Sequence, residues 1–444
     1  MIGGGPAGAE VARLLAARGR EVLLLERDAA PQDRVCGEFL SREAVLYLRS
    51  AGVDLQALGA VPIDTVRVIA RDVIAEVALP FEASSLSRRV LDEASLSNAA
   101  AQGVRVERGA HVTSLVRTAT GHRVELAGGR AVHADAVFVA TGKHELRGHK
   151  RGAGLQNDLV AFKLHYVLSN ENARAIERCV ELTLFPGGYA GLQPIERGRA
   201  NLCLLVRRAH FARCGHQFPA LLEAIAEASP HFASRLQGAS PCWRKPLAMT
   251  SLPYGYVRGH ATDDAFWLGD QGAVIPSFSG DGMSIALHSA RLAADTFRAG
   301  ETPETFQRLL SRDVRAQVRL ATLLSRALVQ TGTQRLLMEF ARFFPARETS
   351  EFFPARETSK FFPARETSKF FPARETSEFF PARETSEFFP ARETSEFFPA
   401  RETSEFFPAR ETSKLLPRLV KAIATHTRVA DAALERTGLL DIRA

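Results

Sequence analysis

Hydrophobic positions near the amino terminus predict a helix followed by a buried strand. Within residues 6–18, Val11, Leu14 and Leu15 recur at the three- and four-residue steps of one helix face. Residues 21–26 ("EVLLLE") form a continuous apolar run, which is typical of a parallel strand covered on both faces. The chain is therefore expected to begin with an α/β unit.

Runs of β-branched and aromatic residues further along predict an antiparallel sheet. They lie at residues 64–82, 158–169 and 179–208, and the last run contains hairpin turns at "PGG" and "ERGR". Residues 221–229 and 305–330 have apolar residues at helical spacing instead. We expect the strands to form a second domain, with a binding cleft between the two domains.

Three glycines, Gly3, Gly5 and Gly8, form the pattern GxGxxG directly before the first predicted helix. The first permits a tight turn, the second lets backbone approach a pyrophosphate, and the third lets the helix pack close to the strand. Glu26 ends the following strand, where an acid accepts hydrogen bonds from a ribose. The expected dinucleotide contacts in this segment are Gly3, Gly5, Pro6, Ala7, Gly8, Glu26 and Arg27.

The glycine motif begins unusually early. Only Met1 and Ile2 precede Gly3, whereas a first strand is expected to need about five residues. Two interpretations stay open, a natural start that lies upstream or a shortened central strand, and the first is favoured.

Four later segments extend the motif. They are "RVCGEFLS" at residues 34–41, a helix that Arg88 precedes, and the apolar strand "ADAVFVATG" that ends at Gly142. In the fourth, residues 266–297, a strand leads to Gly269 and Asp270, a loop with Pro276, Gly280 and Gly282 follows, and a long helix comes next. Glycines at such places allow backbone to lie close to a ligand.

Together these segments resemble the FAD-dependent oxidoreductases with a p-hydroxybenzoate-hydroxylase-like fold. The "CGE" and "PSFSGDGM" segments are most similar to flavoproteins related to geranylgeranyl reductase and to their monooxygenase cousins. The resemblance covers about residues 1–345 and the tail. It implies an α/β (α+β overall) protein with a Rossmann-like FAD-binding domain, a substrate domain with a mixed or antiparallel sheet, and a helical C-terminal segment carrying a repeat insertion.

The resemblance also implies domain bounds. The FAD-binding domain is expected to be discontinuous, and the repeat is expected to interrupt the C-terminal helices. The expected ranges are 1–65, 84–155 and 253–300 for FAD binding, 66–83 and 156–252 for the substrate domain, 301–345 and 418–444 for the C-terminal helices, and 346–417 for the repeats.

By the same resemblance, Arg34 and Arg88 would lie along the FAD, and Asp270 would hold its ribityl chain or pyrophosphate. Residues 279–283 would place backbone N–H groups and a helix N-terminus beside the flavin pyrimidine, where reduced flavin carries negative charge. The further expected cofactor contacts are Cys36, Gly37, Ala140, Thr141, Gly142, Gly269, Pro276, Gly280, Gly282 and Met283.

The substrate half departs from the reductase pattern. Tyr189 and Pro194 match it, but Gly191 and Gln193 stand where the pattern has a Trp and a Phe. This favours a monooxygenase or dehydrogenase of a small organic substrate over a reductase of a hydrophobic C=C substrate, and an impaired flavoprotein relic is a third alternative. If the protein is a reductase, the resemblance implies Cys36 or Tyr189 as the proton source.

The role of two groups of polar, mostly basic residues stays open, and so does the identity of the electron donor. The first group, Lys143, His144, Arg147 and Arg151, and the second, Lys163, His165 and Tyr166, are expected either to bind an anionic substrate or a nicotinamide phosphate, or to be solvated. The chain has no second complete GxGxxG. The donor is therefore expected to be NADPH or NADH bound transiently, or another protein.

The composition of the chain argues against several other functions. The 444 residues carry a net charge of +7 in scattered arginines, without the basic run that tracks nucleic acid. Five cysteines without CxxC spacing favour a reducing, cytoplasmic setting and argue against a metal site. Apolar runs are too short to span a bilayer, which leaves peripheral membrane contact, as of a quinone-linked dehydrogenase, open.

A nine-residue unit, "FFPARETSE" or "FFPARETSK", repeats eight times over residues 343–414. A proline in every unit forbids one continuous helix, and a short helix in each unit is marginal alone. We expect these residues to be a tandem duplication that is mostly disordered and separate from the chemistry.

Overall fold

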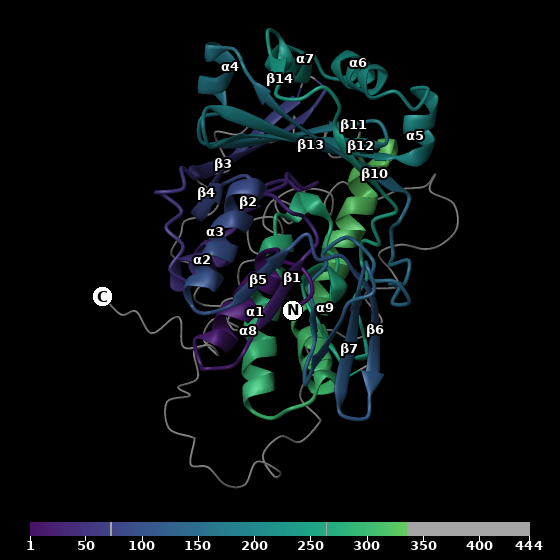
Figure 1. The fold of residues 1–444 in the computed structure, drawn as a ribbon. Helices are drawn as coiled ribbons and strands as arrows, with labels where there is room; N and C mark the ends of the chain where they lie inside the picture. The colour runs from purple at the N-terminus through teal and green to yellow at the C-terminus, as the bar shows by residue number, and fades with distance from the viewer. Residues whose placement is uncertain (72, 263, 335–444) are drawn as a thin grey trace, which may run out of the picture.

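The structure, a computed structural model, describes residues 1–334 except residues 72 and 263. The predictions made for the repeats and for residues 418–444 lie outside the described residues. Figure 1 shows two parts, a lower part that contains the chain's beginning and an upper sheet with helices on its outer face. The long helix α9 (Pro303–Leu328) belongs to the lower part and reaches up to the sheet.

The lower part is organised around short parallel strands. β1 (Leu23–Glu26) pairs with β5 (Arg105–Arg108), and β9 (Phe138–Val139) pairs with β16 (Phe266–Trp267). Ile2 joins the two pairs, because it forms parallel bridges to Leu25 and Val139. A single bridging residue thus stands where a strand of about five residues was expected.

Helices enclose these strands. α1 (Pro6–Ala16) packs against α8 (Gly282–Arg298) and α3 (Arg88–Ala101), and α9 packs against α8. The predicted helix at residues 305–330 is confirmed as α9, whose buried face includes Phe306, Leu310 and Val314. A three-stranded meander that the apolar pattern did not predict adds β6 (Val112–Thr118), β7 (Gly121–Leu126) and β8 (Ala131–Ala134).

The upper part is a nine-stranded mixed sheet with the order β14-β10-β13-β12-β11-β3-β4-β2, in which β15 pairs with β10. Among the described residues, β11 and β3 form the only parallel pair of this sheet, and its other pairs are antiparallel. The strands are β2 (Phe39–Leu40), β3 (Val61–Ala70), β4 (Val73–Ser85), β10 (Leu159–Val167), β11 (Cys179–Phe185), β12 (Gly188–Ile195), β13 (Arg199–Arg207), β14 (Ser240–Pro241) and β15 (Leu247–Thr250).

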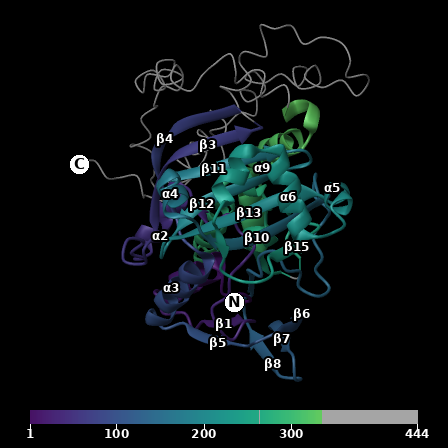
Figure 2. The same cartoon turned by 90° about the horizontal axis from the view of Figure 1, so that it is seen from above.

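Four helices lie on the outer face of this sheet, away from the lower part (Figures 1 and 2). They are α4 (Asn170–Ala175), α5 (Arg208–Arg213), α6 (Phe218–Ala228) and α7 (Pro230–Leu236). Leu221 and Ile225 of α6 are fully buried in a core that includes Phe162 and Leu204 of the sheet. The opposite face of the sheet is therefore left toward the lower part, where α2 (Arg42–Ser50) also lies.

The structure also has two short 3-10 helices. They are η1 (Gly269–Gln271) and η2 (Ser277–Ser279). Among the described residues no helix is long and apolar enough to cross a membrane.

Candidate functional site

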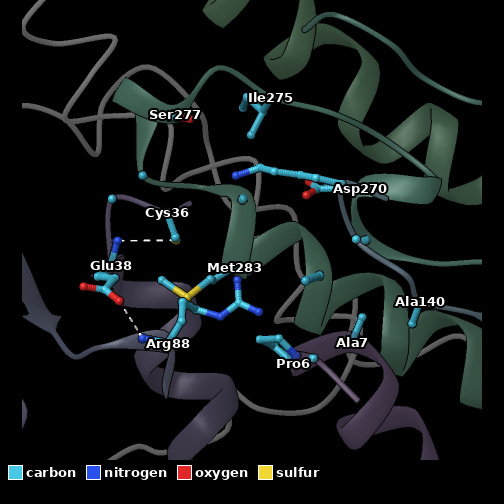
Figure 3. Close-up of a pocket in the computed structure, with 18 of the residues that line it drawn as sticks. Pro6, Ala7, Cys36, Glu38, Arg88, Ala140, Asp270, Ile275, Ser277 and Met283 are labelled. Carbon is cyan, nitrogen blue, oxygen red and sulfur yellow. Dashed lines mark hydrogen bonds between the residues drawn. The ribbon is translucent and has the colours of Figure 1, made fainter. Parts of the chain in front are cut away.

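A groove runs through the lower part between the start of α1, residues 36–39, η1 and the start of α8, and its empty space is about 830 Å³ out to the open mouth. Most of the predicted cofactor contacts line it. These are Gly5, Pro6, Ala7, Cys36, Gly37, Arg88, Ala140, Gly142, Gly269, Asp270, Gly280, Gly282 and Met283. In Figure 3 the side chains of Arg88, Met283 and Asp270 are drawn around this groove.

The remaining predicted contacts, Gly3, Gly8, Glu26, Arg27, Arg34, Thr141 and Pro276, are not among the lining residues of the groove. Gly3 and Gly8 explain its shape instead. A Cβ on Gly8 would lie 1.9 Å from the carbonyl oxygen of Gly3, and one on Gly3, at φ +101°, would lie 2.5 Å from that of Ala140. Glycine therefore allows the helix, the turn and the strand to meet closely.

Glu26 is held by backbone at the end of β1. Its carboxylate accepts hydrogen bonds from the N–H of Gly4 at 2.6 Å and of Asp28 at 3.0 Å. Arg34 lies 3.4 Å from Glu26 and 2.5 Å from Asp28, so its charge is paired. The ribose contact of Glu26 and the FAD contact of Arg34 stay predictions.

The start of α8 forms the other side of the groove. Gly280, at φ +76°, ends η2, and its Cβ position lies 2.5 Å from Phe39, so only glycine fits there. Gly282 then begins α8, and a Cβ on it would meet no atom within 4 Å. The first backbone N–H groups of the 17-residue helix α8 therefore face open space in the groove. Such a helix start is suited to bind an anionic flavin or a phosphate.

Arg88 is the first residue of α3, whose N-cap is Ser87. Its guanidinium binds the carboxylate of Asp92 twice, at 2.7 and 2.8 Å. Burial lowers the pKa of Arg88, but the carboxylate of Asp92 and the nearby sulfur of Cys36 outweigh burial and hold it above its ordinary value. A guanidinium that Asp92 holds in place therefore lines the groove.

Glu38, which lines the groove, is the centre of a buried cluster whose contacts the sequence did not predict. Glu38, at φ +62°, receives the ammonium of Lys163 at Oε1 and lies 2.7 Å from Nε2 of His165 at Oε2. The N–H of Arg88 also donates to Oε1, at 2.8 Å. Burial raises the pKa of Glu38, but Lys163 and His165 outweigh it and hold that pKa below its usual value.

This cluster corrects one expectation. Lys163 and His165 were considered for binding an anion, yet both side chains are fully buried and contact Glu38. Arg151 is also buried, and it binds Glu145 and the carbonyl oxygens of Lys143 and Asp270. These three residues are therefore structural, whereas Lys143 does line the groove.

The cluster also contains atoms of the kind that bind metals. Asp33, Glu38 and His165 bring ligand-type atoms within 4.8 Å of one another. Lys163, however, contacts Glu38 and lies 3.8 Å from Asp33, so an ammonium already neutralises the two carboxylates. The absence of a metal site from the chain stays a prediction, which the ammonium of Lys163 supports at this cluster.

A second cavity lies between the sheet and η2, and Gly37, Phe39, Ser277 and Gly280 are common to both linings. Its wall is mainly apolar. The apolar side chains come from the sheet and η2 and are Val66, Val68, Leu79, Phe81, Val180, Leu182, Leu205 and Phe278. Its other lining residues are Ser41, Tyr189, Gly191, Gln193, Cys203, Ser279 and Asp281.

Several lining residues escaped the motif search. In the groove these are Glu38, Phe39, Leu268, Ile275, Ser277 and Ala286. Glu38 belongs to the quoted "CGE" segment, so its position in that motif was the available signal. The others carry no chemical signal, because apolar and small residues line a groove only through the fold.

Comparisons with known proteins support FAD as the cofactor. Residues 1–166 match the family described as FAD binding domain. Menaquinone reductase of Mycolicibacterium smegmatis is 24% identical over 346 residues, which cover 73% of this chain and 84% of that protein. Digeranylgeranylglycerophospholipid reductase 2 of Methanopyrus kandleri is 27% identical over 315 residues, which cover 66% and 75%.

Solved structures agree with the fold. Halogenase PltM in complex with phloroglucinol and FAD has a TM-score of 0.62 and 17% identity, covering 79% of this chain and 80% of that one. PqsL, a probable FAD-dependent monooxygenase from Pseudomonas aeruginosa, has a TM-score of 0.60 and 16% identity, covering 74% and 94%. The chain is therefore an FAD-dependent oxidoreductase whose residues 1–166 match an FAD-binding domain.

Proposed function

We propose that the protein is an FAD-dependent reductase of an apolar, isoprenoid-type substrate that occupies the second cavity. The observation that carries the proposal is the mainly apolar wall of that cavity and its common boundary with the FAD groove. Two of the relatives are named as reductases of menaquinone and of a geranylgeranyl lipid. Both substrates contain isoprenoid chains, which an apolar cavity would accept.

The residues of the groove would hold FAD in the predicted orientation. The pyrophosphate would lie at the N-terminus of α1, near Arg88 and Asp270, and the flavin would lie between Cys36 and the start of α8. When bound, FAD supplies hydride chemistry that no side chain provides. Gly37, Phe39, Ser277 and Gly280 would then lie where cofactor and substrate meet.

Gly191 and Gln193, which replace two rings of the reductase pattern, widen this cavity without making it more polar. A Cβ on Gly191 would meet only the carbonyl oxygen of Cys203, at 3.6 Å. Nε2 of Gln193 donates a hydrogen bond to the hydroxyl of Ser85 at 2.5 Å, so this donor is paired within the protein. Both replacements are therefore compatible with an apolar substrate.

Oxygen transfer is the second candidate, and it is favoured by Gly191 and Gln193, which stand in place of two large aromatic rings. A wider cavity would accept a bulky aromatic molecule next to the cofactor. The two functions differ in what consumes the reduced cofactor, because a reductase passes hydride to its substrate and a monooxygenase requires oxygen.

The test is anaerobic reoxidation. The purified protein is reduced with dithionite, mixed with geranylgeraniol or with a short-chain menaquinone, and followed at about 450 nm, where oxidised flavin absorbs. We expect the flavin absorbance to return without oxygen and the lipid to gain two hydrogen atoms by mass spectrometry. Reoxidation that requires oxygen, with an oxygenated product, would instead establish the monooxygenase.

A further inference from the structure

We propose that Asp281 is a catalytic acid that delivers the proton of the reduction from the wall of the apolar cavity. This inference rests on the proposed function, since it names a second participant in the same reaction. Asp281 lies in the "PSFSGDGM" segment, but the resemblance gave a role there only to backbone N–H groups and not to this carboxyl group.

The position of Asp281 supports this role. It is the residue directly before α8, in the turn that follows η2 and Gly280, and it lines the second cavity together with Ser279 and Phe278. Its side chain is 7% exposed, and Oδ2 accepts a hydrogen bond from Nε2 of Gln317 at 3.0 Å. A carboxyl group is thus held by α9 at the edge of the substrate space.

The surroundings favour the protonated form. Burial and the negative charge of Glu43 raise the pKa of Asp281 to about 7, and hydrogen bonds with Gln317 and Ser279 only partly oppose this. Glu43 comes from α2 and is itself buried, with its carboxylate 2.9 Å from the hydroxyl of Ser41. A buried carboxyl group close to a second negative charge ionises less readily than an exposed one, so Asp281 keeps its proton nearer to neutral pH.

The other two proposed donors fit less well. Burial raises the pKa of Tyr189, which makes its hydroxyl a weaker acid. Cys36 lines the FAD groove but is not among the residues lining the second cavity, and its sulfur accepts a hydrogen bond from the N–H of Glu38 at 3.4 Å. Asp281 therefore combines access to the cavity with a pKa suited to proton transfer near neutral pH.

The step balances without a further reactant. Asp281 would give its proton to one alkene carbon as its O–H bond breaks, while bound reduced FAD would supply a hydride, with its electron pair, for the other carbon. The resulting carboxylate regains a proton from water after the product leaves, and a nicotinamide or protein donor restores the cofactor. A neutral Asp281 also avoids repulsion with the negative charge that a reduced flavin would carry beside this turn.

The matched variants are Asp281→Asn, which keeps shape and hydrogen bonding but has no acidic proton, and Asp281→Glu, which keeps the acid. In single-turnover reoxidation by geranylgeraniol, we expect D281N to be slower by about 100-fold or more and D281E to retain more of the rate. The wild-type rate should fall above pH about 7, and Glu43→Gln should move this fall to lower pH, because it removes the charge that raises the pKa.

A readout without turnover separates this inference from the proposed function. Infrared difference spectra of the oxidised protein between about pH 5 and pH 9 should show a protonated carboxyl band that disappears in D281N. If the wild type is not reoxidised by either lipid, the proposed function fails. The inference is overturned if the D281N and wild-type infrared spectra agree, or if Cys36→Ser or Tyr189→Phe, rather than D281N, removes the pH-dependent fall.

Discussion

Nε2 of His165 lies 2.7 Å from Oε2 of Glu38, and both side chains are fully buried. The contact joins β10 of the upper sheet to the segment that forms the floor of the FAD groove. Glu38 also receives Lys163 from the same strand and the N–H of Arg88 from α3. One carboxylate therefore ties the substrate sheet to two sides of the cofactor site.

We expect Glu38→Gln to destabilise the protein by about 3–5 kcal/mol, because it leaves the buried ammonium of Lys163 without its carboxylate partner. Urea denaturation at neutral pH measures this free energy. The folded-state pKa of Glu38 is lowered, so its contribution is complete above its ordinary pKa near 4.5 and is lost as pH falls through the folded value. The difference between wild type and E38Q should therefore shrink only in acid.

The matched control is Glu82→Gln. Glu82 also pairs with an arginine, Arg49, but its side chain is 75% exposed. Loss of this pair should cost less than about 1 kcal/mol. Equal effects of the two substitutions would show that burial of the Glu38 cluster does not contribute to stability.

Gly282→Ala is expected to separate folding from FAD binding. Its Cβ would meet no protein atom within 4 Å, and alanine at a helix start reduces the entropy of the unfolded chain, so stability should rise slightly. The same methyl group occupies the groove and should weaken FAD binding, measured by flavin fluorescence after titration of the apoprotein.

Two other glycines are the controls. Gly8→Ala should lower stability, because its Cβ would clash with the backbone of Gly3 at 1.9 Å. Gly259→Ala meets nothing within 4 Å and does not line the groove, so it should leave FAD affinity unchanged. Weakened FAD binding in the Gly259 variant would argue against a local effect at Gly282.

Asp281→Asn should change the pH dependence of stability. The folded pKa is raised from 3.8 to about 7, so the folded state keeps a proton that the unfolded state loses between these values. Wild-type stability then falls with rising pH across that interval, by up to about 1.4 kcal/mol per pH unit. In urea titrations, the free energy of unfolding of D281N should rise relative to that of the wild type as pH increases to about 7. A difference in unfolding free energy that does not change with pH would contradict a raised pKa of Asp281.

Gly191→Trp tests the substrate cavity. The Cβ position is compatible with the fold, and the ring restores the Trp that the reductase pattern has at this position. For a reductase of an isoprenoid-type substrate we expect normal FAD content and reoxidation by geranylgeraniol at least as fast as in the wild type, whereas a loss of rate of about tenfold, or about 1.4 kcal/mol, would contradict this function. Val167→Trp, at a position 51% exposed on β10, is the control and should have no effect.

Features of the fold that depend on one short segment could be predicted from the sequence of that segment. The spacing of Gly3, Gly5 and Gly8 predicted a strand–helix turn, which the contacts of Gly8 with Gly3 explain. The amphipathic pattern of α9 predicted a helix whose buried face is seen at Phe306 and Leu310. These features depend on backbone sterics and on hydrophobic periodicity, both of which are visible in short windows.

Relationships between distant segments could not be predicted in this way. Lys163 and Glu38 are 125 positions apart, so nothing local indicated that the lysine was neutralised rather than available to an anion. The pKa of Asp281 is likewise raised by its burial and, to a smaller extent, by Glu43 from another helix. Pairing of the strands brings such residues together, and burial then determines their charge.

The central claim is that the groove of this chain holds FAD, and the most direct test is the visible spectrum of the purified protein with identification of what denaturation releases. We predict peaks near about 370 and 450 nm, the signature of oxidised flavin, and release of FAD at about one molecule per chain. A folded protein that is colourless and does not take up added FAD would contradict the account, and so would one that releases only FMN.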